Sequence, residues 1–237
     1  MKIIDALVSL GVAINAYELV PWGFYSSLTC RALQNAATVD VLIELGANIN
    51  AIAGCESGCT ALQAVALAGE EWHAREFLHR GADVNALGPS KYCFTALQAA
   101  IIAENDALIH LFLEAGADVN AASASNGGKT ALQAAALKSD NRLVKNVAGR
   151  GANVNAPACQ ERGATTLQIA AIKGNFDIVV SLLEHGADIN ACAYEVERRT
   201  ALQAAAECGR LDIVHLFLEN GGANMKSSEI DGAGRVV

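Results

Sequence analysis

The residues whose type and spacing best suit chemistry are three cysteines, Cys55, Cys59 and Cys93. Cys55 and Cys59 stand four positions apart in one loop, and Cys93 stands one position before the counterpart of Cys59 in the next repeated segment. Thiolates on adjacent loops are suitable zinc ligands or a redox pair. A structural zinc site takes four ligands, and no fourth ligand is evident in the sequence. A metal or redox site at these cysteines is therefore kept only as an alternative.

The five histidines do not converge on one site. His79 and His185 lie just before a glycine that ends a predicted helix, where a cation suits the helix dipole. His110 and His215 occupy one column of the repeat described below but lie three units apart, about 30 Å at about 10 Å per helix layer. His73 falls in a column that is otherwise apolar, which predicts a core or near-core position. The other members of that column are Leu108, Leu143, Ile178 and Ile213.

Composition and motifs exclude several functions. The sequence contains no glycine-rich phosphate loop, no His-Glu-x-x-His and no Gly-x-Ser-x-Gly, so we expect no enzyme activity and no cofactor. The net charge of −8 argues against a general nucleic-acid binder. No uninterrupted apolar stretch is long enough to span a membrane. The seven cysteines follow no disulfide spacing, which favours a cytoplasmic or nuclear protein that is not secreted.

The dominant feature of the sequence is an internal repeat of 35 residues. Thr-Ala-Leu-Gln begins at Thr60, Thr95, Thr130 and Thr200, and a Thr-Thr-Leu-Gln variant begins at Thr165. A ladder of glycines keeps the same step along the chain, and most of them precede a phrase such as Ala-Asp-Val-Asn-Ala. These glycines are Gly11, Gly46, Gly81, Gly116, Gly151, Gly186 and Gly221. A fixed period of this length indicates stacked structural units.

Each unit predicts two helices and a loop. The threonine is a good N-cap for a short helix in which Leu132, Ala135 and Ala136 recur at helical spacing. A break at Ser139 or at an equivalent glycine precedes a second, more apolar helix, which ends at a glycine suited to a left-handed C-cap. Gly149 lies inside one second helix and weakens it by about 1 kcal/mol relative to alanine. One unit cannot bury its own apolar face, so neighbouring units must stack as a solenoid.

The phrase Thr-Ala-Leu-Gln-Ala-Ala followed by Gly-Ala-Asp-Val-Asn-Ala resembles the ankyrin repeat, over roughly residues 1–226. The resemblance implies an all-α fold of helix-turn-helix units with β-hairpin-like loops. Alanine replaces the family's proline, and glutamine replaces a histidine whose implied role is a hydrogen bond between units; an amide supplies the same donor. The period of 35 exceeds the usual length of about 33 and predicts longer loop tips.

The glycine ladder sets the predicted organisation. We expect a leading half-repeat at residues 1–16, then six helix pairs in units starting near residues 25, 60, 95, 130, 165 and 200. The solenoid domain spans 1–226, and a flexible tail follows at 227–237. The unit near residue 25 is irregular, because the threonine column there holds Tyr25.

The resemblance implies that partners bind at the loop tips and at the exposed edge of the first helix. Four units place Leu or Ile at that edge, forming an apolar stripe, and two of them follow it with lysine: Leu67, Ile102, Leu137, Lys138, Ile172 and Lys173. Aromatic residues in or beside the tips are further candidates: Trp22, Phe24, Tyr25, Tyr92, Phe94 and Tyr194. Burial of the stripe under the long loops, and packing of the aromatics between neighbouring tips, stay open as alternatives.

The sequence therefore predicts a non-catalytic scaffold that binds a partner protein or peptide through a concave groove and the loop tips. A self-associating structural module is the first alternative. An enzyme or a metal protein using the loop cysteines is the second.

Overall fold

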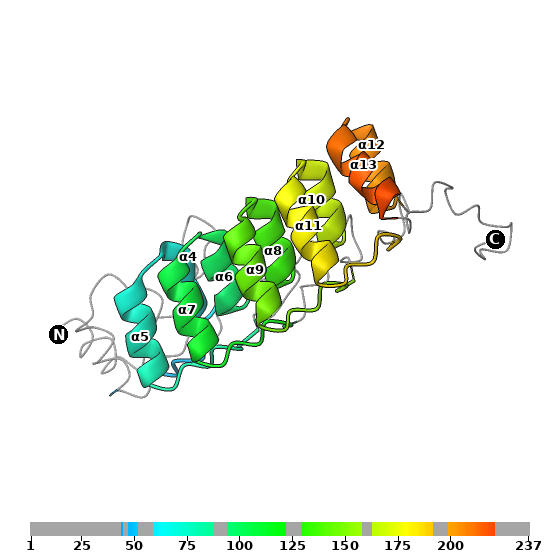
Figure 1. Cartoon of the computed structure of the whole chain (residues 1–237). Helices are drawn as coiled ribbons and strands as arrows, with labels where there is room; N and C mark the ends of the chain where they lie inside the picture. The colour runs from blue at the N-terminus through cyan, green and yellow to red at the C-terminus, as the bar shows by residue number, and fades with distance from the viewer. Residues whose placement is uncertain are drawn as a thin grey trace, which may run out of the picture. The chain divides into compact units, whose positions relative to one another are not determined.

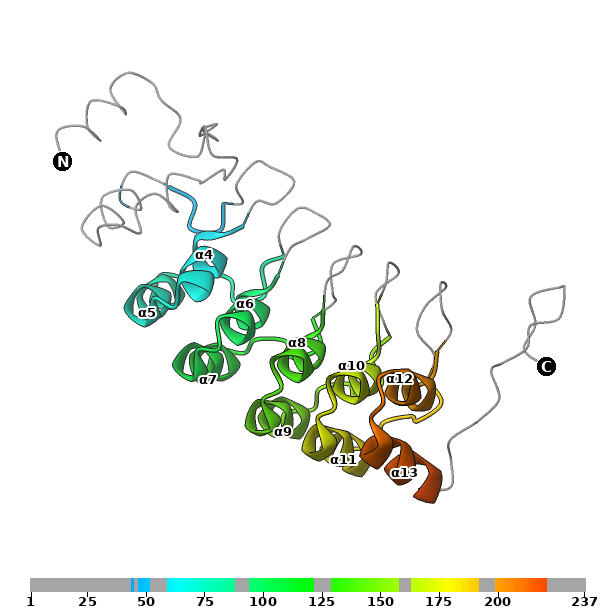
Figure 2. The same ribbon diagram turned by 90° about the horizontal axis from the view of Figure 1, so that it is seen from above.

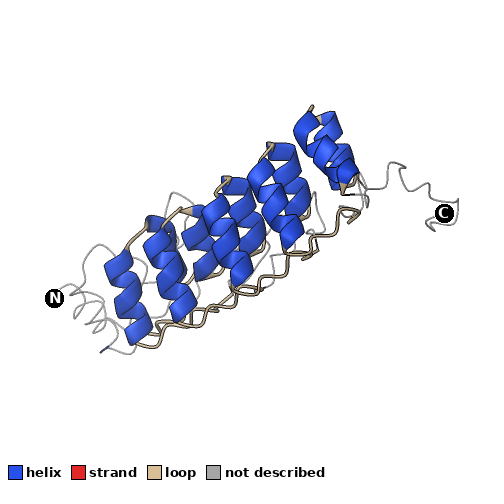
Figure 3. Ribbon diagram, viewed as in Figure 1, coloured by secondary structure: helices blue, strands red, loops and turns tan. Residues whose placement is uncertain are grey.

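The computed structural model describes residues 44, 47–51, 59–87, 94–121, 129–157, 163–191 and 199–220. Within these ranges the chain forms ten helices, labelled α4 to α13 in Figure 1, and no strand. Figure 3 shows helices joined by loops throughout the described part. The expected all-α class is confirmed. The chain divides into two compact units, residues 1–124 and 125–237, which are described in turn.

The first unit contains two described helix pairs. The first pair is α4 (Ala61–Ala68) and α5 (Glu71–His79), and the second is α6 (Ala96–Ile102) and α7 (Asp106–Glu114). Helix α4 packs against α6, and α5 packs against α7, so the first and second helices form two layers (Figure 2).

The second unit contains three helix pairs. Its first helices are α8 (Ala131–Lys138), α10 (Thr166–Lys173) and α12 (Ala201–Glu207). Its second helices are α9 (Asn141–Gly149), α11 (Phe176–Glu184) and α13 (Leu211–Glu219). Helix α10 packs between α8 and α12, and α11 packs between α9 and α13. Both layers are visible in Figure 2.

The first helices of the five described pairs have as their N-caps Thr60, Thr95, Thr130, Thr165 and Thr200. The half-repeat at 1–16, the pair near residue 25, the tips of the expected hairpins and the tail at 227–237 lie outside the described residues.

Each first helix starts at a reciprocal pair of hydrogen bonds between threonine and glutamine. At α10, the Gln168 backbone N–H donates to Thr165 Oγ1 at 3.2 Å, and the Thr165 N–H donates to Gln168 Oε1 at 2.8 Å. The same capping box opens α4, α6, α8 and α12. Two backbone N–H groups that the helix leaves unpaired are thereby satisfied. The predicted threonine cap is confirmed, and the capping role of the glutamine is an additional finding.

The core lies between the two helix layers of each unit. Small residues of the first helices are almost fully buried, as Ala66 and Ala171 illustrate with 0% exposure. The second helices contribute the larger side chains, and Phe77, Phe112 and Phe217 occupy one column at 0% exposure. Alanine lets the first helices approach closely, while the phenylalanines fill the space behind them.

Two glycines near the end of α9 differ in backbone conformation. Gly149 is the last residue of the helix, is exposed, and would bring an added Cβ within 4 Å of no other atom. Gly151 follows the helix with a φ of +85°, in the left-handed region that L residues rarely adopt. Gly149 therefore lowers the stability of the helix through its backbone entropy and is not needed for the turn. Gly151 allows the turn, because it adopts the positive φ.

Replacing Gly149 with alanine is expected to raise the free energy of unfolding by about 0.5–1 kcal/mol, because alanine restricts the unfolded chain and favours the helix. Gly151→Ala is the matched control and is expected to lower it by about 1 kcal/mol, because of its positive φ. Urea unfolding followed by circular dichroism measures both. A loss of stability in Gly149→Ala would contradict this account of α9.

Candidate functional site

Asparagine side chains join the turns of successive repeats within each of the two compact units. In the first unit, Asn50 Nδ2 donates to the Gly81 carbonyl at 3.3 Å, and the Asp83 N–H donates to Asn50 Oδ1 at 2.8 Å. In the second unit, Asn155 makes the same two bonds, with Gly186 at 2.9 Å and Asp188 at 2.8 Å. One amide thus satisfies a donor and an acceptor of the next turn. The recurring asparagine of the Gly-Ala-Asp-Val-Asn phrase is therefore part of the frame.

In four of the five described helix pairs, the capping glutamine also links the first helix to the turn that follows its own helix pair. Gln63 Nε2 donates to the Ala86 carbonyl at 2.7 Å, and Gln168 Nε2 donates to the carbonyl oxygens of Ala191 at 3.2 Å and Arg199 at 2.5 Å. Gln98 and Gln133 make equivalent bonds, to Ala121 and Pro157 respectively. The expectation that an amide replaces the donor of the family's histidine is confirmed at these four positions.

The candidate edge residues stand at the ends of the first helices, directly after these frame residues. In the first unit, Leu67 is 45% exposed and Ile102 is half-buried. In the second unit, Ile172 is 39% exposed and Leu137 is half-buried. The lysines that follow, Lys138 and Lys173, are both exposed. None of these four apolar residues is buried, and the loops that would cover the stripe in the alternative lie outside the described residues.

In α12 the edge position holds a carboxylate in place of an apolar residue. Glu207, at the end of α12, forms an ion pair with Arg199, which precedes its start. The pair therefore extends along the exposed side of α12 and shows that the positions before and at the end of a first helix share one face. By the repeat, the positions equivalent to Arg199 and Glu207 hold Lys129 and Leu137 at α8, and Ala164 and Ile172 at α10.

Of the six aromatic candidates, the structure describes Phe94, which is half-buried just before α6. Trp22, Phe24, Tyr25, Tyr92 and Tyr194 lie outside the described residues.

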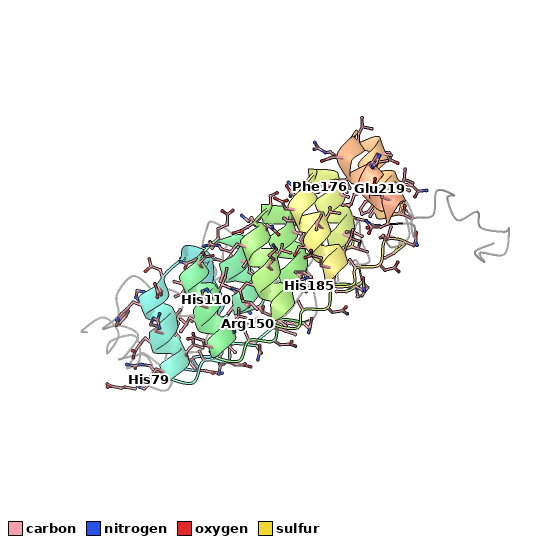
Figure 4. The ribbon with its side chains drawn as sticks, in the orientation of Figure 1. His79, His110, Arg150, Phe176, His185 and Glu219 are labelled. Atoms are coloured by element: carbon pink, nitrogen blue, oxygen red, sulfur yellow. The ribbon has the colours of Figure 1, made fainter. Side chains whose placement is uncertain are left out.

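Sequence reasoning missed several apolar side chains that are exposed on or beside the second helices. Trp72 is 57% exposed near the start of α5, and Phe176 and Leu211 are 40% and 76% exposed as the first residues of α11 and α13. Figure 4 labels Phe176 at the beginning of α11. The signal was available, because these residues fall outside the helical spacing set by buried side chains such as Ile178 and Leu182.

The histidines do not gather at one site: two lie in α5, and the others lie in α7, at the end of α11 and in α13 (Figure 4). His79 ends α5, and His185 caps α11 with its Nδ1 at 2.7 Å from the Ser181 carbonyl oxygen, as the dipole argument predicted. His110 and His215 are exposed. His73 is near the core as expected, since its side chain is 16% exposed and lies 3.5 Å from a Glu70 carboxylate oxygen.

The structure describes only one of the three cysteines of the alternative metal or redox site. Cys59 is half-buried before α4, while Cys55 and Cys93 lie outside the described part of the chain. Within that part, His, Cys, Asp and Glu side chains form no group of three that is arranged to hold a metal ion. None of the helices described has the length and hydropathy that a membrane crossing requires.

Comparison with known proteins agrees with the geometry. Residues 139–229 match the family model for ankyrin repeats (3 copies), a segment that contains the described helices α9 to α13. A comparison with curated proteins gave no match. Ankyrin repeats are generally protein–protein interaction modules and are typically non-catalytic. The same 35-residue frame of capped helix pairs and linked turns recurs in both compact units, and the chain carries ankyrin repeats over residues 139–229.

Proposed function

We propose that the chain is a non-catalytic scaffold that binds a partner protein through the exposed edge of its first helices and through its loop tips. One observation carries the proposal. In α10, Ala170 and Ala171 are 0% exposed, and the next residue, Ile172, is 39% exposed. The helix therefore presents an apolar side chain to solvent directly after its packed segment, and exposed apolar patches mark interaction sites.

The proposed contact residues follow from this position in each unit. At the first-helix edge they are Leu67, Ile102, Leu137, Lys138, Ile172 and Lys173. At the loop tips they are the aromatic candidates Trp22, Phe24, Tyr25, Tyr92, Phe94 and Tyr194, since aromatics are enriched among residues that dominate binding energy. We also place the chain in the cytoplasm or nucleus, because its seven cysteines follow no disulfide framework.

The double variant Leu137→Asp with Ile172→Asp is expected to reduce capture of the partner by more than tenfold. An unpaired carboxylate in a desolvated contact costs about 2–5 kcal/mol, and every 1.4 kcal/mol is tenfold in affinity. The measurement is affinity capture by the full chain from an extract of the source cells, with proteins quantified by mass spectrometry. Circular dichroism checks that helical content is unchanged.

The matched control makes the same chemical change on the second helices, in the variant Phe176→Asp with Leu211→Asp. Both residues are at least as exposed as Ile172, so the control adds two carboxylates at positions outside the proposed surface. It is expected to retain capture. Capture that survives the first variant, or that is lost equally in both, would overturn the assignment of the surface.

A second candidate function is self-association, which one observation favours. Ala206 in α12 is exposed, whereas its counterparts in the other four units, such as Ala171, are 0% exposed, and Leu218 in α13 is 43% exposed. These two exposed apolar side chains lie on the last described helix pair, where a further stacked unit would cover them. Sedimentation at several protein concentrations separates the candidates. A mass that rises with concentration supports self-association, and a monomer at all concentrations rules it out.

A further inference from the structure

The last turn of α9 buries smaller side chains than the other second helices of its unit. Val147 occupies the column of Phe217, and both side chains are 0% exposed. Ala148 occupies the column of Leu218, and α11 holds leucine at both positions. Burial stabilises a fold roughly in proportion to the apolar area that is removed from water. The last turn of α9 therefore gains less from packing than the same turn of α11.

The backbone on both sides of this helix adds two local costs. Gly149, in the last turn of α9, loses more conformational freedom on folding than any residue with a side chain. Ser139, between α8 and α9, has a φ of +62°, in the left-handed region. The equivalent residues before α11 and α13 are Gly174 and Gly209, which adopt that region without a Cβ clash. The repeat of α8 and α9 therefore carries costs that the two following repeats lack.

The charges in the first turn of α9 also differ from those of its neighbours. This turn contains no acidic residue and holds Arg142, whereas α11 and α13 have Asp177 and Asp212 there. A cation at the positive end of the helix dipole is unfavourable. The Asp140 carboxylate nevertheless fixes the start of the helix, since it accepts a hydrogen bond from the Leu143 N–H at 3.1 Å. The helix is therefore held at its start and least stable in its last turn.

Opening of α9 would act on α8, because the two helices pack against each other (Figure 2). Ala136 in α8 and Val144 in α9 are both 0% exposed, so each helix covers apolar side chains of the pair. Each repeat of a solenoid is stabilised by its own contacts and by those with its neighbours, so one helix pair can open while the others stay folded. Without α9, the end of α8 with Leu137 and Lys138 has no second layer behind it.

We propose that α8 and α9 open together, ahead of the rest of the second unit, and that this opening removes the α8 part of the partner edge. The opening is a property of the chain alone, and its consequence for binding rests on the proposed function. A partner that contacts Leu137 requires a folded α8, so its affinity is scaled by the fraction of closed molecules. By mass action, the bound partner in turn holds the pair closed.

The test is amide hydrogen exchange of the full chain, followed by mass spectrometry of its peptides. We expect the amides of residues 145–149 in α9 to be protected about tenfold less than those of residues 180–184 in α11, because local opening exposes them without global unfolding. We expect residues 135–138 in α8 to be less protected than residues 170–173 in α10. Equal protection of α9 and α11 would overturn the proposal.

The variant Gly149→Ala is expected to slow exchange in α9 by about two- to fivefold, because alanine favours the helix. Exchange in α8 is expected to slow by the same factor, while α11 stays unchanged. The matched control is Glu184→Ala, at the equivalent position of α11, and it is expected to leave exchange in α9 unchanged. Slowing of α9 without α8 would overturn the joint opening, and equal slowing of α9 in both variants would show that the opening is not local. None of these results depends on a partner, so the capture experiment with Leu137→Asp and Ile172→Asp judges the proposed function separately.

Discussion

Replacing Phe112 with alanine is expected to lower the free energy of unfolding by about 3–5 kcal/mol, the range for large aromatic side chains in a packed core. Phe112 lies in α7 at 0% exposure, and α7 packs against both α5 and α6. Alanine would remove the ring's contacts and leave a cavity that neighbouring helices fill only in part. Urea unfolding followed by circular dichroism measures the loss.

Phe176→Ala is the control with the same chemical change. Phe176 begins α11 and is 40% exposed, so much of its ring already contacts water in the folded state. Its loss is expected to cost about 1 kcal/mol or less, as for surface substitutions outside a packed core. Similar losses in the two variants would mean that the phenylalanine column does not form the core between the helix layers.

The second large effect is expected at Gln168, where leucine should lower the free energy of unfolding by about 2–4 kcal/mol. Gln168 is 2% exposed and bonds with the Thr165 N–H, the Ala191 carbonyl and the Arg199 carbonyl. Leucine has a similar volume but can make none of these bonds. Buried polar groups left without a partner cost about 1–3 kcal/mol each, with part of the cost relieved where water reaches them.

Gln203→Leu is the matched control, at the equivalent position of α12. Gln203 is half-buried, and its hydrogen bonds in the structure join it to Thr200. Within residues 199–220 the bonds of Gln203 are with Thr200 alone, so leucine there removes the capping bond and the expected cost is about 1 kcal/mol. If the two variants lose the same stability, the link from the first helix to the next turn contributes little and the cap alone accounts for the glutamine.

The helical frame could be predicted from the sequence because its determinants are local. Thr165 caps the helix that begins one residue later, and Gly151 adopts the positive φ that ends a second helix. Both depend on neighbours within a few residues, so residue type and spacing were sufficient. The near-core position of His73 followed in the same way, from the apolar column in which it stands.

Hydrogen bonds between successive repeats were harder to predict, because they join residues more than twenty positions apart. Asn155 reads as a turn residue in sequence, yet its amide bonds with Gly186 and Asp188 of the next turn. The family resemblance predicted that Gln168 donates a hydrogen bond to the next repeat, as its bond to the turn at Ala191 does. Its reciprocal bond with Thr165 was not predicted. A polar residue that recurs at every period is the signal that identifies such links.

The candidate surface could likewise be predicted only in part. The family resemblance assigned Ile172 to the exposed edge of its helix, and the exposure of its side chain agrees with that position. The exposure of side chains such as Trp72 and Leu211 was not predicted, although helical spacing in α5 and α13 places both outside the buried columns. The repeating columns determine the frame, and we infer that the varying columns determine the partner.

We propose that a partner protein lies against the edge of α8 and α10. Site-specific photo-crosslinking tests it most directly, with a photoreactive phenylalanine derivative placed at Ile172 in one variant and at Lys145, exposed on α9, in the other. The account predicts a crosslinked partner from position 172 and little or none from position 145. Crosslinking of the partner from position 145 but not from position 172 would contradict it.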